Sequence, residues 1–95
     1  MSKLLRKNLL QEVEDIICKE RQDAYGAPEQ SFERIAKYWS IYLNTPITPL
    51  QVSNMMILFK IARTQGQIDK LDNYLDAAGY AIISGSLLVQ REGEN

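Results

Sequence analysis

The chain has 95 residues, of which 45% are hydrophobic and 24% are charged, and its formal net charge is −1. It has no histidine and a single cysteine, which excludes histidine-dependent nucleophilic catalysis, zinc sites built on histidine or paired cysteines, and internal disulfides. This composition is typical of one small globular domain spanning residues 1–95, and its lack of a basic excess argues against binding to duplex nucleic acid.

Apolar residues recur at helical spacing in the first half of the chain. The first segment predicts a helix over residues 4–24, which Gly26 and Pro28 would end. The second predicts a helix over residues 29–43, closed at Asn44. Four aromatic residues in or near the second helix are expected to be core: Phe32, Tyr38, Trp39 and Tyr42.

The second half of the chain predicts two more helices. Thr48, Pro49 and Gln51 form the pattern of a capping box with proline at the first helical position, and this helix should run to about residue 64. The fourth helix is predicted over residues 69–90, with Asp69 as its N-cap. Because no segment alternates with period two, the sequence predicts an all-α fold, a compact four-helix domain.

Both later helices carry more apolar surface than one subunit of this size can bury. Residues 55–59 are five consecutive apolar residues, and such a helix should be buried on more than one side. The fourth helix has one apolar face along Leu71 and Ile82, and a second along residues 80–87. We therefore predict a homo-oligomer. Its contact should use the second half of the fourth helix, with small residues allowing close approach: Gly79, Ser84, Gly85 and Ser86.

The most informative charges are Lys60 and Arg63, which lie about 60° apart on one face of the third helix. Their partners could be internal, namely Asp72 and Asp76 one turn apart on the next helix, or they could hold a bound phosphate. Both alternatives are open from sequence.

A second group of candidates lies at the end of the first helix. Glu20 continues an apolar stripe, so its carboxylate should be paired or should hold a metal. Arg21 and Tyr25 follow it, and Tyr25 and Tyr80 are the two tyrosines that we expect to contact a ligand. The sequence shows no signal peptide and no membrane span, so a cytoplasmic protein is expected.

Several of these residues occur in an order that resembles a family of small uncharacterised phage and prophage proteins. The resemblance extends from about residue 15 to residue 90. It is carried by Arg21, Tyr25-Gly26, Phe32, Ile35-Ala36, Trp39, Ile47-Thr48, Met55-Met56, Lys60-Ile61-Ala62-Arg63, Asp72-Asn73-Tyr74-Leu75-Asp76 and Gly79-Tyr80-Ala81. More distantly, the chain is similar to the nucleotide modification associated domains of phage and to MazG-like all-α nucleotide pyrophosphohydrolases. This resemblance implies a helical oligomer that binds a nucleotide between subunits.

The MazG-like enzymes carry paired glutamates on the helix that precedes the aspartate helix, whereas this chain has Lys60 and Arg63 there. We therefore favour a non-catalytic protein, without cofactor, that captures a small phosphate-bearing nucleotide, a class that includes host defence signals. The expected ligand-binding residues are Arg21, Tyr25, Lys60, Arg63, Asp72, Asn73, Asp76 and Tyr80.

Two alternatives are kept. One is a magnesium-dependent nucleotide pyrophosphohydrolase whose metal ligands would be Glu20, Asp23, Asp72 and Asp76. The other is a structural or protein-inhibiting oligomer, in which these charges would form internal salt bridges.

Overall fold

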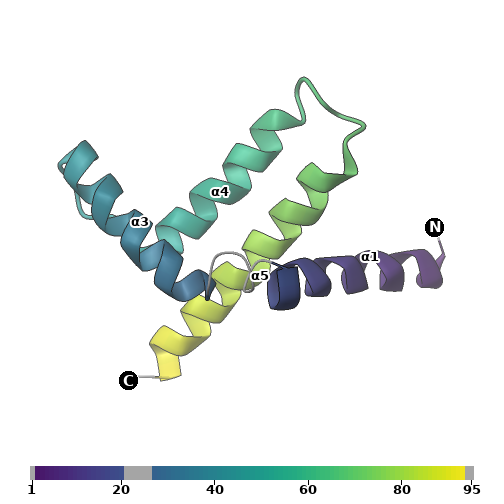
Figure 1. Ribbon diagram of the computed structural model, residues 1–95, viewed down its shortest axis with the longest axis horizontal. Coiled ribbons are helices and arrows are strands. Elements are labelled where there is room, and N and C mark those ends of the chain that lie inside the picture. Colours follow the sequence, from purple (N-terminus) through teal and green to yellow (C-terminus); the bar gives the residue numbers. More distant parts are fainter. Residues whose placement is uncertain (1, 21–26, 94–95) are drawn as a thin grey trace.

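The structure is a computed structural model of the chain, and it describes residues 2–20 and 27–93, apart from the side chains of residues 19–20 and 91–93 (Figure 1). In these residues the regular structure is entirely helical, as predicted. Its elements are α1 (Lys3–Asp15), the π-helix η1 (Ile16–Glu20), α3 (Pro28–Leu43), α4 (Pro49–Arg63) and α5 (Leu71–Gly93).

Local capping signals explain where three helices begin or end. The Thr48 hydroxyl accepts a hydrogen bond from the backbone N–H of Gln51, while the Gln51 side chain accepts one from the backbone N–H of Thr48. This confirms the predicted capping box at the start of α4. Ser2 caps α1 with a single hydrogen bond, in which its Oγ accepts from the backbone N–H of Leu5, and α3 ends at Asn44 in the left-handed conformation (φ 52°).

One predicted helix boundary differs in the structure, and another lies outside the described residues. After Asp15 the first helix widens into η1, and the predicted end at residue 24 lies outside the described residues. The N-cap assignment of Asp69 is wrong: α5 begins at Leu71, and Asp69 lies in the preceding turn. Asp72 does lie in the first turn of α5, where a carboxylate interacts favourably with the helix dipole.

Helices α4 and α5 run antiparallel beside one another and make the most extensive helix contact (Figure 1). At its centre Ser53 is fully buried. Its Oγ donates to the backbone carbonyl of Tyr80 at 2.9 Å and accepts from Ser84 Oγ at 2.8 Å. These two side chains are small enough to let the helices approach closely, and the hydroxyl of each has a hydrogen-bond partner inside the contact.

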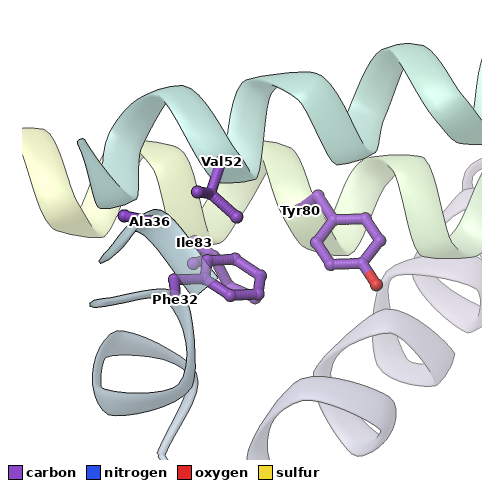
Figure 2. Close-up of a cluster of buried hydrophobic side chains, with 5 residues drawn as sticks. All are labelled: Phe32, Ala36, Val52, Tyr80 and Ile83. Atoms are coloured by element: carbon purple, nitrogen blue, oxygen red, sulfur yellow. The ribbon is translucent and has the colours of Figure 1, made fainter. Parts of the chain in front are cut away.

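The core lies where α3 meets this pair of helices. Figure 2 shows its buried side chains, which come from three helices: Phe32, Ala36, Val52, Tyr80 and Ile83. The rings of Phe32 and Tyr80 stack with centroids 5.9 Å apart. Phe32 and the half-buried Trp39 confirm the prediction that they are core, but Tyr38 and Tyr42 are exposed on the outer side of α3.

The prediction of which α5 face meets another subunit is wrong. Tyr80, Ile83 and Ser84 are buried inside the subunit, and Leu87 packs against the same core. Sequence reasoning failed here because polar groups of this α5 face have hydrogen-bond partners on α4. Ser53 of α4 pairs with both the Ser84 hydroxyl and the Tyr80 carbonyl. The exposed part of α5 is instead the opposite stripe, which includes Ile82 and Val89.

Helix α4 is also less enclosed than its apolar run suggests. Val52 is fully buried, but Leu58 and Phe59 are exposed, so within one subunit the helix is covered on only one side. None of the described helices combines the length and the apolar character that a membrane span requires.

Candidate functional site

The candidate site is centred on an ion pair between α4 and α5. The antiparallel register brings Lys60, near the end of α4, against Asp76 in the second turn of α5. Lys60 Nζ lies 2.9 Å from Asp76 Oδ2, and the side chains are 14% and 17% exposed. Of the two alternatives that the sequence left open for Lys60, the structure shows the internal pair.

Arg63 is arranged differently from Lys60. Its guanidinium lies over the ring of Phe59, 5.7 Å from the centroid, and Lys60 Nζ lies 5.9 Å from the same centroid. Arg63 is exposed and makes no ion pair with any carboxylate in the part of the chain that the structure describes. Two cations thus converge on one half-exposed aromatic ring, and Arg63 keeps its hydrogen-bond donors available.

Asn73 lies one turn before Asp76 on α5 and is only 2% exposed. Its Nδ2 is buried and has no hydrogen-bond partner among the described residues. A buried polar group without a partner typically costs about 1–3 kcal/mol. Among the described residues, the Asn73 amide therefore has a donor without a partner, one helical turn before Asp76.

On the side of α1, Asp76 borders a small gap formed with Ile16, Ile17, Gly79 and Tyr80. The gap has a volume of about 10 Å³, which is room for one water molecule rather than a nucleotide. The approach is close at this point of α5: a Cβ at position 79 would lie 3.3 Å from Ile17 Cγ1, so the Ile17 side chain would have to shift by a few tenths of an ångström. η1 therefore packs directly on the α5 backbone beside the candidate site.

Two predicted ligand-binding residues are not part of this arrangement. The ring of Tyr80 is stacked on Phe32 in the core, so Tyr80 cannot offer a face for stacking on a ligand without disrupting the core. Asp72 is exposed and borders a shallow hollow with Glu12 and Asp15. In the described part of the chain, no three histidine, cysteine, aspartate or glutamate residues are placed to hold a metal ion.

The remaining predicted residues cannot be placed. Arg21, Asp23 and Tyr25 lie outside the described residues, as does the side chain of Glu20 at the end of η1. Of the four carboxylates of the enzymatic alternative, the structure therefore describes only Asp72 and Asp76. The roles assigned to these residues stay predictions.

Sequence reasoning did not include Phe59 among the ligand-binding residues, although Phe59 lies on the same side of the predicted third helix as Lys60 and Arg63. The signal was available, because Phe59 and Arg63 are four residues apart and such pairs are neighbours on a helix surface. It also missed Ser53, whose role depends on Ser84, 31 residues further along the chain.

Comparison with known proteins gives the family. Residues 8–88 match the family model described as Domain of unknown function (DUF6378). The chain belongs to this family. It is 40% identical over 77 residues to the Gene 55 protein of Mycobacterium phage D29, an alignment that covers 81% of this chain and 51% of the relative. It is also 40% identical over 75 residues to the Gene 55 protein of Mycobacterium phage L5, covering 78% of this chain and 48% of that protein.

The chain thus spans about half the length of these phage relatives. The predicted resemblance to a phage family is confirmed at this level. The names of the family and of the relatives state no activity, and no solved structure matches the chain.

Proposed function

We propose that this protein is a non-catalytic nucleotide-binding protein that holds the phosphate of its ligand at the end of α4. The observation that carries the proposal is Arg63. Its guanidinium is exposed and lies over the ring of Phe59, beside Lys60. No carboxylate in the described part of the chain forms an ion pair with it. A forked guanidinium with a second cation beside it matches the geometry and charge of a phosphate group.

The residues around Arg63 support this role. Phe59 offers a half-exposed ring on which a base could stack once a ligand draws the cations toward its phosphate. Asn73, one turn before Asp76 on α5, has an amide donor without a partner among the described residues, which a polar ligand group or an ordered water would satisfy. Asp76 would keep the Lys60 ammonium in place and would limit the net positive charge of the site.

We further propose that a second subunit completes the site. The gap at Asp76 is too small for a nucleotide, and Phe59 and Arg63 lie on the open side of α4. A ligand held there by one subunit would stay largely in water, where contacts to phosphate are weak. Residues from a neighbouring copy would cover it.

Isothermal titration calorimetry against nucleoside monophosphates, nucleoside triphosphates and cyclic dinucleotides tests this proposal. Wild type should bind at least one class, and Arg63→Ala should weaken that binding by about 1.5–3 kcal/mol, the usual cost of losing a charged hydrogen bond. Because Arg63 is exposed, this variant should fold normally. Lys37→Ala, which removes an exposed cation from α3, is the matched control and should bind as wild type does.

Lys60 needs a more conservative change, since removing it alone would break a largely buried ion pair with Asp76. The double variant Lys60→Gln/Asp76→Asn removes both charges and keeps groups that can hydrogen-bond. It should weaken phosphate binding while the fold persists. Absence of heat with every nucleotide class, or unchanged binding by Arg63→Ala, would refute the proposal.

A structural or protein-inhibiting oligomer is a second candidate, favoured by the internal Lys60–Asp76 pair. It predicts a stable assembly that binds no nucleotide in the same calorimetric series.

A further inference from the structure

An apolar groove runs between α1 and α5, on the side of the subunit away from α3. Its lining comes from both helices and includes Leu9, Leu10, Val13, Leu71, Tyr74 and Leu75. The groove has a volume of about 340 Å³. Leu10 is 64% exposed at its rim, and Leu71 and Tyr74 are also largely open to solvent. An apolar hollow of this kind marks a docking surface when it remains uncovered.

The whole chain exposes more surface than a compact monomer would. A folded monomer of 10.9 kDa is expected to expose about 5,600 Å². This chain exposes 7047 Å², about 1,450 Å² more. Each partner in a standard interface buries about 800 Å², and obligate dimers bury more. The excess is therefore large enough to supply one obligate interface.

The shape of the molecule shows where part of this excess arises. The radius of gyration is 14.6 Å, against about 12 Å for a compact domain of this length. In Figure 1, α1 extends outward from the middle of α5, and its N-terminal end lies far from the other helices. Only one residue of α1, Val13, is buried. One side of α1 packs on α5, and apart from Val13 none of its residues is buried within the subunit.

The charges of α1 are arranged against its own dipole. Lys3, Arg6 and Lys7 lie in its first half, and Glu12, Glu14 and Asp15 in its second half; its first turn has no acidic residue and its last turn no basic one. An isolated helix is stabilised by the opposite arrangement. An antiparallel helix with the same sequence would compensate, because its acidic half would lie against the basic half of α1.

We propose that the α1–α5 groove binds α1 of a second copy of this chain, in an antiparallel pair related by a two-fold axis at Leu10. Lys7, Leu10 and Glu14 are spaced by three and four residues, so they follow one stripe of α1. About an axis at Leu10, the two Leu10 side chains meet at the centre. Lys7 then lies close to the partner's Glu14, and Glu14 lies close to the partner's Lys7.

This arrangement is isologous, since each subunit offers a groove and fills the groove of its partner. It names one contact surface for the homo-oligomer in the proposed function, and it rests on the assembly part of that proposal alone. It does not require a nucleotide. Its test therefore measures molar mass in the absence of nucleotide, so that failure here is distinguishable from failure in the calorimetric series.

The test is a charge reversal on α1, read by sedimentation equilibrium of the whole chain, with circular dichroism to check that each variant is helical. Wild type should have twice the mass of a single chain, or an even multiple of it. Lys7→Glu and Glu14→Lys should each weaken the dimer by about tenfold, because both symmetric pairs become repulsive. The double variant Lys7→Glu/Glu14→Lys should regain wild-type assembly.

Each single reversal also improves the fit of the charges to the dipole of an isolated α1, so weaker assembly could not be attributed to loss of the helix. Leu10→Asp should raise the dissociation constant of the dimer by at least about a hundredfold, since two carboxylates, one from each subunit, would be buried against each other at the axis. Ile41→Asp changes a residue that is 77% exposed on α3 and should leave the mass unchanged.

The proposal would be overturned by a single-chain mass for wild type at micromolar concentration. It would also be overturned by failure of the double reversal to restore assembly, or by dissociation with Ile41→Asp and not with Leu10→Asp.

Discussion

The ion pair between Lys60 and Asp76 should contribute measurably to the stability of the α4–α5 hairpin. Its 2.9 Å separation and exposures of 14% and 17% place it between two well-characterised cases. Fully exposed pairs contribute about 0–1 kcal/mol, while breaking a buried pair costs about 3–5 kcal/mol. We therefore expect Lys60→Met and Asp76→Asn each to reduce the free energy of unfolding by about 2 kcal/mol, with a coupling energy of about 1–2 kcal/mol.

The assay is urea denaturation of wild type, both single variants and the double variant, followed by circular dichroism at fixed protein concentration. Concentration must be fixed because assembly would add to the apparent stability. The hydrogen bond of Gln11 Nε2 to Asp15 Oδ1 on the exposed side of α1 is a matched control, and its cycle should give less than about 0.5 kcal/mol. A coupling energy for Lys60 and Asp76 no larger than this control would refute the reasoning.

Three smaller changes test the packing and capping of the fold by the same denaturation measurement. Ser53→Ala should cost about 1–3 kcal/mol, because Ser84 loses its acceptor inside the helix contact; a neutral result would mean that the buried hydroxyl pair is not formed. Thr48→Ala should cost about 1 kcal/mol through loss of one arm of the capping box, and an unchanged midpoint would contradict this. Gly85→Ala should stabilise the protein by about 0.5–1 kcal/mol, since Gly85 is exposed in α5 and a Cβ there meets nothing within 4 Å; destabilisation would show a contact at this position.

The parts of the fold that sequence predicts well are those that local signals determine. The capping box forms between Thr48 and Gln51, only three residues apart, so a short stretch of sequence contains both of its partners. The same holds for the end of α3 at Asn44, which adopts the left-handed conformation. The transition from α1 into η1 has no comparable local signal, and Ile17 of η1 packs against Gly79, 62 residues further along the chain.

Sequence reasoning failed where the environment of a residue depends on a distant helix. The face of α5 with Asn73, Asp76 and Ser84 mixes polar residues with the apolar ones of residues 80–87. It is the inner face of the subunit, where α4 supplies Lys60 and Ser53 as partners for Asp76 and Ser84. For the same reason, Tyr80 was expected to contact a ligand and instead stacks on Phe32. Hydropathy alone cannot show which polar residues will be paired.

Of the predicted ligand-binding residues, the structure pairs Lys60 with Asp76 and places Lys60 and Arg63 at the ring of Phe59. Their role in binding a ligand stays a prediction. The sequence could not show which of the two cations, Lys60 or Arg63, would pair with an aspartate. The structure separates them: Lys60 is paired, and Arg63 rests on Phe59.

Native mass spectrometry with a panel of nucleotides tests the central claim most directly, because one spectrum reports both the number of chains and the mass of bound ligand. The account predicts a dimer, or an even multiple of it, that carries whole numbers of one nucleotide, and an Arg63→Ala variant of the same assembly without that ligand. A protein that shows no nucleotide with any member of the panel, or an Arg63→Ala variant that retains the ligand, would contradict it.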